Sequence, residues 1–275
     1  MACPPEAAAS PADAAGAGLP SLTVAVSTRG SRALGLDPAA LPAAPGLDWL
    51  VLVQEPRSDP RLGPHLDALA ARDGVSVARL AGTGLAQSRN AGLDRAAGEI
   101  VLIADDDAPH LPGALAQVRR FFAEHPGLDL LVGRALTPDG RPRRRPTPPR
   151  ALTLFNAGRA TSHEIAFRAL PVREAGIRFD EGFGAGAGTG AFLGEEYIFL
   201  ADCLRAGLKG AHRPIAIAGH EAASSGHRWA GSEAARAAVL ARVFGRAAPL
   251  ARAGFALRNL RRFAGPRALL RFLRG

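Results

Sequence analysis

The sequence predicts an α/β fold in which a mostly parallel sheet is flanked by helices. Short apolar runs rich in β-branched residues alternate with longer helical patterns through the first half of the chain. This alternation is typical of βαβ units, whose strands are parallel and buried on both faces. Apolar residues make up 47% of the 275 residues and charged residues 21%, so the chain can bury a sizeable core.

Five segments have the composition of buried strands, and three helical patterns lie between them. Gly98 fits the position after a helix end, and Pro112 is tolerated in the first turn of a helix. Because the carboxyl ends of parallel strands share one edge, the loops after these strands should gather where such sheets bind ligands. The expected strands are 22–27, 49–54, 75–80, 99–104 and 128–135, and the expected helices are 60–72, 85–97 and 111–124.

The second half of the chain is less regular. A Pro/Arg-rich loop at 138–150 separates it from the first half, and a glycine-rich loop precedes a helix expected at 195–206. Strand-like patterns occur at 162–172 and 215–218, and the end of the chain is helical with breaks at two prolines, Pro249 and Pro266. We therefore divide the chain into a disordered Ala/Pro-rich tail (1–20), one domain (21–230, with halves 21–135 and 151–230) and a basic helical tail (231–275).

Three consecutive aspartates, Asp105, Asp106 and Asp107, follow the apolar strand at 99–104. Neighbouring carboxylates repel one another, and removing them from water is costly. Either they face open solvent as a turn or a helix cap, or a positive charge lies among them. Mg²⁺ and Mn²⁺ prefer oxygen ligands, so a divalent cation is one candidate for that charge.

Three motifs in order resemble those of family 2 glycosyltransferases. "GTGLAQSRNAGLDRAAGEIVLIADDD" (82–107) is similar to the helix with Gly-Leu-x-x-x-Arg-Asn-x-Gly that leads into a strand ending in the DXD motif. "VAVSTRG" (24–30) resembles the family's first strand and loop, and "FLGEEYIFLADCLRAGLKG" (192–210) its acidic ED-type motif. The resemblance covers about 21–228 and implies a GT-A fold, a nucleotide-sugar donor, Mn²⁺ or Mg²⁺, and inversion at the anomeric carbon.

The resemblance also implies roles for the acidic residues. Asp105 and Asp107 would hold the metal, and Asp106 would contact the donor ribose or sugar. The base that deprotonates the acceptor would be Glu196, with Glu195 as the alternative, because the family usually has Asp at this place. Helical spacing turns Glu196 toward an apolar stripe and Glu195 toward a mixed face. Two solvated glutamates at a helix N-terminus remain the non-catalytic interpretation.

Other residues are expected to bind the donor. They follow the first two strands or lie on the helix before the aspartates, and a histidine late in the domain is placed near the metal or diphosphate, with a structural role as its alternative. The donor-binding candidates are Ser27, Thr28, Arg29, Gln54, Glu55, Arg89 and Asn90, and the histidine is His220.

The chain carries a net charge of +9, almost all of it from arginine, with 11 arginines and one acid in 228–275. Such a tail is typical of helices that lie on anionic lipid, or of a helical cap with solvated arginines. Nucleic acid is not expected as a partner because aromatic residues amount to only 5%. With two cysteines, no secretory signal and no long apolar run, the protein is expected in the cytoplasm or peripherally on the inner face of the cell membrane.

The predicted function is therefore an inverting, metal-dependent glycosyltransferase. It would move a sugar from a nucleotide-sugar donor to a hydroxyl of a glycan or lipid-linked acceptor, in cell-surface polysaccharide or glycolipid synthesis. A nucleotidyltransferase is one alternative, although the loop after the first strand has only Gly30 where a glycine-rich phosphate loop is expected. The other is a basic membrane or nucleic-acid binder with a degenerate transferase fold.

Overall fold

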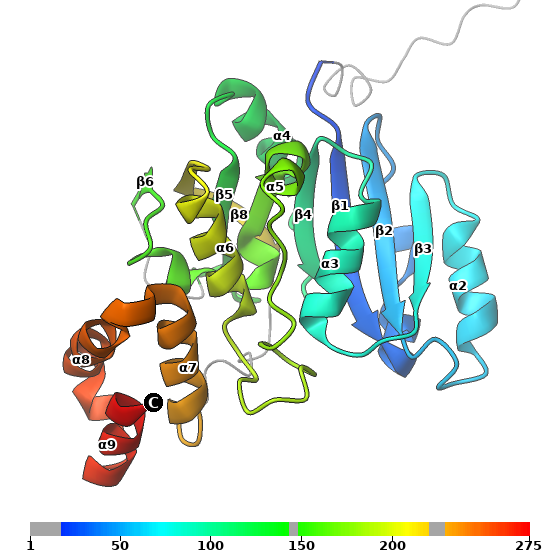
Figure 1. The fold of residues 1–275 in the computed structure, drawn as a ribbon. Coiled ribbons are helices and arrows are strands. Elements are labelled where there is room, and N and C mark those ends of the chain that lie inside the picture. Colours follow the sequence, from blue (N-terminus) through cyan, green and yellow to red (C-terminus); the bar gives the residue numbers. More distant parts are fainter. Residues whose placement is uncertain (1–17, 143–147, 220–228) are drawn as a thin grey trace, which may run out of the picture.

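The computed structural model describes residues 18–142, 148–219 and 229–275. Within these residues one mixed sheet runs through the molecule in the strand order β3-β2-β1-β4-β7-β5-β8-β6 (Figure 1). The strands are β1 (Leu22–Arg29), β2 (Leu47–Gln54), β3 (Val75–Leu80), β4 (Ile100–Asp105), β5 (Leu130–Leu136), β6 (Arg150–Ala151), β7 (Ile165–Arg168) and β8 (Gly210–Gly219).

The first four strands of that order are parallel, as the alternating sequence pattern predicts. β7 then runs antiparallel to both of its neighbours, β4 and β5, while β5 and β8 are parallel again. The five predicted strands are confirmed, with ends shifted by one or two residues. The segment 215–218 is the end of the longer strand β8, and the predicted loop at 138–150 ends in the short strand β6.

Two layers of helices cover the sheet. The helix α2 (Leu62–Ala70), the helix α4 (Ala114–Glu124) and the 3-10 helix η1 (Gly30–Gly35) pack on one face. The helices α3 (Leu85–Arg95), α5 (Ala169–Glu174) and α6 (Glu195–Arg205) pack on the other. The strand expected over 162–172 is therefore only partly correct, because it ends at Arg168 and continues as α5, where Pro171 is tolerated in the first turn.

The core on the α6 side is aromatic. Phe167 and Phe179 are buried, and both contact Phe199 of α6, with the rings of Phe179 and Phe199 stacked at 4.1 Å between centroids. Aromatic pairs of this kind add about 0.5–1.5 kcal/mol to the burial of their area. This stack fixes the N-terminal half of α6 against the segment around Phe179, which is where the candidate site is built.

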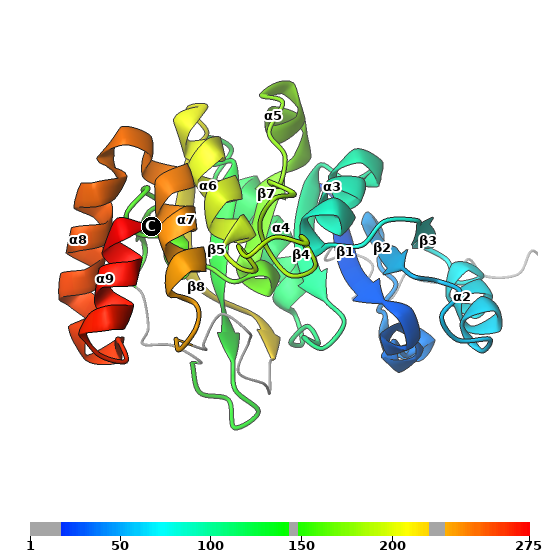
Figure 2. The same ribbon diagram turned by 60° about the horizontal axis from the view of Figure 1, so that its bottom comes forward.

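The C-terminal helices α7 (Glu233–Phe244), α8 (Ala248–Asn259) and α9 (Pro266–Arg274) stack outward from α6 (Figure 2). Ile198 of α6 packs against Val239 and Val243 of α7, and Phe272 of α9 is fully buried. Most of the apolar stripes of the tail are thus used inside a helical cap. No helix in the described ranges is long and apolar enough to cross a membrane.

Both predicted breaks in the tail are confirmed, because Pro249 and Pro266 lie in the first turns of α8 and α9. Proline is favoured there because the first turn of a helix leaves its N–H groups unpaired. The proposed N-terminal tail (1–20) lies outside the described residues except for its last three positions. The division of the chain at 230 stays a prediction.

Candidate active site

The residues expected to bind a donor gather at the carboxyl ends of neighbouring strands. In the parallel register Ser27 of β1 lies opposite Asp105 of β4, and Arg29 of β1 lies opposite Gln54 of β2. The loop after β4, which carries Asp106 and Asp107, therefore lies beside the loop after β1. This is the edge of the sheet where the sequence predicts a ligand site.

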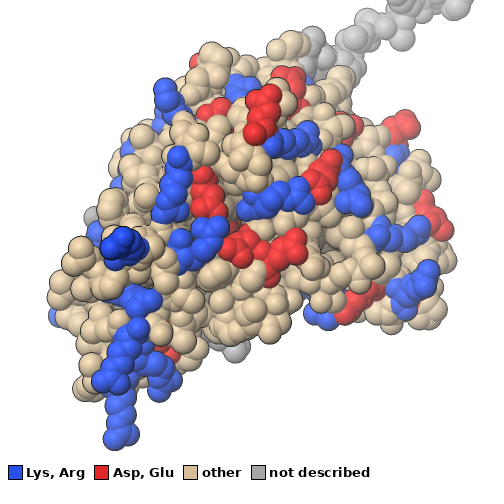
Figure 3. All heavy atoms as spheres, viewed as in Figure 1, with Lys and Arg blue, Asp and Glu red and all other residues tan. Residues whose placement is uncertain are grey.

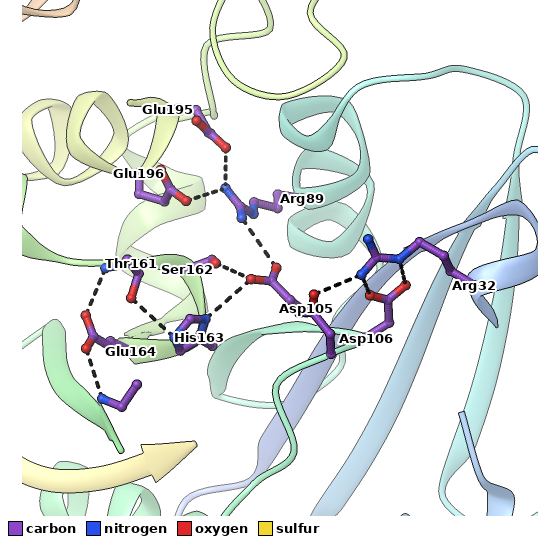
Figure 4. Close-up of polar contacts among 12 residues, drawn as sticks. Arg32, Arg89, Asp105, Asp106, Thr161, Ser162, His163, Glu164, Glu195 and Glu196 are labelled. Atoms are coloured by element: carbon purple, nitrogen blue, oxygen red, sulfur yellow. Dashed lines mark hydrogen bonds and ion pairs between the residues drawn. The ribbon is translucent and has the colours of Figure 1, made fainter. Parts of the chain in front are cut away.

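Asp105 lies deep in the site and accepts hydrogen bonds from its neighbours. Ser162 Oγ donates to its carboxylate, His163 Nδ1 lies 3.4 Å from Oδ2, and Arg89 Nη2 lies 3.6 Å from Oδ1 (Figure 4). Burial alone raises the pKa of Asp105, but the bond from His163 and the charge of Arg89 outweigh it and hold that pKa well below the usual range. Asp105 is therefore ionised at neutral pH.

Ser162 and His163 reach Asp105 because the turn that carries them is fixed from behind. Glu164 Oε2 accepts a hydrogen bond from the backbone N–H of Thr161 at 2.9 Å, and its Oε1 accepts one from the backbone N–H of Ala135 at 2.9 Å. This capping box closes the short 3-10 helix η4 (Ser162–Glu164). The sequence analysis missed the role of this turn, for which the only signal was the polar "TSHE" before an apolar run.

Arg32 supplies a positive charge that reduces the repulsion between the carboxylates of Asp106 and Asp107. Its guanidinium forms a two-pronged ion pair with Asp106 and lies 3.0 Å from Asp107 Oδ2. Thr28 Oγ1 donates a further hydrogen bond to Asp106 at 2.6 Å. The sequence analysis missed Arg32, whose one signal is its place in the loop after β1, beside the end of β4.

Arg89 joins the two ends of the site. Its side chain is 2% exposed, and its Nη1 lies 3.0 Å from Glu195 Oε1 and 3.3 Å from Glu196 Oε1. The same guanidinium lies 3.6 Å from Asp105. One buried cation thus connects α3, the end of β4 and the first turn of α6, as Figure 4 shows. A buried charge is tolerated when it is paired in this way.

The helical-face argument for the two glutamates is wrong. It turned Glu196 inward, whereas Glu195 is the more buried residue, with its side chain 5% exposed against 19% for Glu196. The reason is the glycine loop, which covers the first turn of α6: a Cβ placed on Gly184 would lie only 2.5 Å from Glu195 Cδ. Burial, followed by the charge of Glu196, raises the pKa of Glu195 to about 7 even though Arg89 opposes the shift.

Two residues that were expected to bind the donor, Asn90 and Gln54, form hydrogen bonds to backbone groups of the protein itself. Asn90 Oδ1 accepts from the backbone N–H of Phe179 at 2.8 Å, and its Nδ2 donates to the Phe179 carbonyl at 3.0 Å. Gln54 Nε2 donates to the carbonyl of Gly84 at 3.0 Å, and Gly84 precedes the first turn of α3. These bonds hold α3, and with it Arg89, in place.

Three other candidates lie at the end of β1 and β2. Ser27 is buried and accepts a hydrogen bond from Ser88 Oγ at 2.8 Å. Arg29 is exposed and pairs with Glu55 at 2.6 Å, where Glu55 has a φ of 50°. A non-glycine residue with positive φ is uncommon and costs backbone energy, so this turn has a specific shape. His220 lies outside the described residues.

A cavity of about 400 Å³ lies beside these groups. Its polar end is formed by Arg89, Asp105, Glu195 and Glu196, and it continues past them toward α7. The volume falls within the roughly 300–1,000 Å³ of ordinary ligand pockets. Both glutamates can therefore face a bound molecule at the end of the cavity where Asp105 lies.

The charges and donor atoms of this site suit a hard divalent cation. Arg32 and Arg89 pair with the five carboxylates, three from 105–107 and two from 195–196, and His163 Nδ1 lies 3.4 Å from Asp105 Oδ2. Five ionised carboxylates carry three more charges than the two guanidinium groups. Within the described parts of the chain no group of three or more His, Cys, Asp or Glu side chains is arranged to hold a metal. Mg²⁺ needs only one or two carboxylates when a substrate phosphate supplies further oxygens, so Asp105 and Asp107 fit that requirement.

The comparisons with known proteins agree with the sequence motifs. Residues 47–179 match the profile of a family described as "Glycosyl transferase family 2", a range that includes Arg89 and all three aspartates. No curated protein sequence matches the chain.

Solved structures share the fold at low sequence identity. A crystal structure of S. aureus TarS residues 1–349 matches with a TM-score of 0.56 and 18% identity over 86% of this chain and 74% of that one. A structure of S. aureus TarS matches with a TM-score of 0.58 and 18% identity over 82% of this chain, which spans 44% of the TarS chain. The complex of TarS 1–349 with UDP-GlcNAc matches with a TM-score of 0.55 and 16% identity over 80% of this chain and 66% of that one. The predicted GT-A fold is confirmed.

Proposed function

Because the chain is a glycosyltransferase that carries a family 2 domain at residues 47–179, we propose that it transfers a sugar from a nucleotide-sugar donor with inversion. The acceptor is a hydroxyl of a glycan or lipid-linked molecule, and Mn²⁺ or Mg²⁺ assists. The observation that carries this proposal is the cluster in which Arg89 contacts Asp105, Glu195 and Glu196 at 3.0–3.6 Å. This cluster supports a site in which the donor end and the acceptor end lie beside each other.

The donor nucleotide is assigned to the end of β1 and β2. A hollow there of about 850 Å³ is lined by Glu55, Arg57, Ser58 and Arg79. These side chains offer hydrogen bonds and charge to a base and ribose. TarS 1–349, which shares the fold, has been crystallised with UDP and with UDP-GlcNAc, and this supports a nucleotide sugar as the donor class.

The diphosphate is assigned to the region of Asp105, Asp106 and Asp107. A divalent cation bound there would stabilise the charge that develops on the departing diphosphate. Asp105 and Asp107 would hold it, while Asp106, fixed by Thr28 and Arg32, would reach the ribose or sugar. Arg32 adds a positive charge 3.0 Å from Asp107, which reduces the repulsion that the donor would meet.

Glu196 is the proposed base and Glu195 its alternative. A base must contact the acceptor hydroxyl, and the side chain of Glu196 is the more exposed of the two in the cavity. Glu195 is enclosed by Arg89 and the glycine loop, and burial, followed by the charge of Glu196, raises its pKa to about 7. Glu196→Gln should abolish transfer and leave donor binding nearly intact. If Glu195→Gln alone behaves this way, the two roles must be exchanged.

Calorimetry with UDP and GDP, with and without Mn²⁺, tests the donor site. We expect nucleotide binding that requires Mn²⁺ and is lost in Asp107→Ala. Asp139→Ala is the matched control, because Asp139 is an exposed aspartate with a neighbouring arginine in a loop that lines neither hollow. Nucleotide affinity that is unchanged by saturating Mn²⁺ would contradict the metal-dependent mechanism.

The C-terminal cap supports an anionic membrane surface as a partner. Basic side chains gather over α8 and α9 (Figure 3), and the side chains of six exposed arginines in these helices and in the 3-10 helices η6 (Gly245–Ala247) and η7 (Leu260–Arg262) have no ion-pair or hydrogen-bond partner among the described residues. Leu250 and Leu257 of α8 are 79% and 71% exposed on the same helical face. Exposed leucines beside unpaired arginines are typical of interfacial helices. The six are Arg246, Arg258, Arg261, Arg267, Arg271 and Arg274.

Sedimentation with vesicles tests this surface. Binding to vesicles with anionic lipid, weakened by salt and by Leu257→Ser, is the expected outcome. Leu170→Ser changes an equally exposed leucine on α5 and should leave binding as it is. Equal binding to neutral vesicles, or none to either kind, would remove the membrane from the proposal.

A further inference from the structure

The cavity beside the glutamates has an apolar half that the chemistry of sugar transfer leaves unused. Beyond the carboxylates its walls come from the segment before η4, from the end of the glycine loop, and from α7 and α8. The C-terminal helices are therefore part of the site. Its apolar side chains are Phe155, Phe192, Leu193, Val239, Leu240 and Phe255, and Tyr197 and the α7 residue Arg236 also line the cavity.

Two of these phenylalanines are exposed to solvent. Phe155 is 86% exposed and Phe192 is 38% exposed, and the ring of Phe155 contacts that of Phe244 at 5.6 Å between centroids. Burying a phenylalanine gains about 1.5–3 kcal/mol, so leaving one in water forgoes most of that stabilisation. Exposed apolar side chains that border a cavity are typical of ligand-binding sites.

The apolar half begins directly at the proposed base. Tyr197, the residue after Glu196, lines the cavity, and its hydroxyl donates to the Leu154 carbonyl at 2.5 Å. Burial raises the pKa of Tyr197 to about 12, so its hydroxyl stays neutral. A molecule whose hydroxyl meets Glu196 thus extends over a neutral ring toward the phenylalanines.

We propose that this half of the cavity binds the apolar part of an amphiphilic acceptor, namely an alkyl or aryl group attached to the hydroxyl-bearing unit. The inference rests on the proposed function and names the acceptor class for the same site. Phe255 of α8 lines the cavity, while Leu250 and Leu257 of the same helix face solvent.

Binding of octyl β-glucoside, kept below its micelle concentration, against methyl β-glucoside tests the subsite. The two probes share the sugar and differ in the apolar chain. With UDP and Mn²⁺ present, we expect at least tenfold tighter binding of the octyl compound by calorimetry, which corresponds to about 1.4 kcal/mol. Phe155→Ala combined with Phe192→Ala should remove that preference, and each change removes an exposed ring, so folding should be retained.

One control separates the subsite from other apolar surfaces. Leu170→Ala removes an exposed leucine of α5 outside the cavity and should leave the preference unchanged. Equal affinity for the two glucosides, or a preference that survives the double phenylalanine change, would overturn the subsite. UDP binding in the same samples reports on the donor site by itself. If UDP does not bind but the octyl compound is still preferred over the methyl compound, the transferase assignment is refuted and the subsite is not.

Discussion

Replacing Arg89 by methionine removes a cation that contacts three carboxylates. Methionine keeps much of the volume and removes the charge. Arg89 is buried with its side chain 2% exposed, and Glu195 lies only 3.0 Å away with 5% exposure. Breaking a buried ion pair by removing one partner costs about 3–5 kcal/mol, because the charge left behind has neither water nor a counter-ion. We therefore expect Arg89→Met to lower the free energy of unfolding by about 3–5 kcal/mol at pH 8.5.

The loss should depend on pH, and its sign follows from the carboxylates. Burial and the charge of Glu196 already raise the pKa of Glu195 to about 7, and Arg89 is the group that opposes this rise. Without Arg89 the folded protein retains more protons than the unfolded chain at neutral pH. Stability then falls as pH rises, by about 1.4 kcal/mol per pH unit for each additional proton retained. The destabilisation should therefore be clearly smaller at pH 5.5 than at pH 8.5.

Urea denaturation at both pH values measures this effect. Arg89→Met with Glu195→Gln should recover part of the loss at pH 8.5, because both members of the closest pair are then neutral. Arg178→Met is the control: it breaks the ion pair with Asp94, whose side chains are 46% and 50% exposed, and should cost under about 1 kcal/mol. A cost for Arg89→Met below about 1 kcal/mol, or one that is the same at both pH values, would refute the reasoning.

Three further outcomes can be measured. Asn90→Ala leaves the backbone N–H and carbonyl of Phe179 without their partners, so unfolding in urea should show a loss of about 2 kcal/mol while UDP affinity is kept. Glu195→Gln should remove the fall in melting temperature that the wild type shows between about pH 4.5 and 7, since its raised pKa favours the protonated form when folded; an unchanged profile would contradict that pKa. Arg32→Ala frees Asp106 and Asp107 from their cation, so Mn²⁺ should bind more tightly in calorimetry without nucleotide, and weaker binding would show that Arg32 supports the metal site.

The sequence predicts the part of the fold that depends on local patterns. Strands buried on both faces are mostly apolar, so their positions follow from the sequence pattern, and their alternation with helices predicts that they are parallel. The order also brings residues 27–29, 54–55 and 105–107 to one edge, as the register of β1 with β2 and β4 confirms. The insertion of β7 between β4 and β5 could not be predicted, because four residues of IAFR carry no information about direction.

The sequence fails where the outcome depends on what covers a side chain. Helical spacing locates Glu195 and Glu196 on α6, but their burial is decided by the glycine loop that closes over the first turn. Arg32 was missed for a related reason. Its partners, Asp106 and Asp107, are more than 70 positions away, and only the pairing of β1 with β4 brings them together.

Arg89 makes the two ends of the site dependent on each other. Its guanidinium is shared between Asp105 at the proposed donor end and Glu195 and Glu196 at the proposed acceptor end, at distances that differ by only 0.6 Å, from 3.0 to 3.6 Å. The three carboxylates compete for the same guanidinium. When Asp105 binds a donor complex, its attraction for Arg89 is weaker, and the guanidinium stabilises the ionised form of the glutamates more strongly. The pKa of Glu195, which Arg89 already lowers, then falls further, so we expect Glu195 to lose its proton most readily when the donor is already in place.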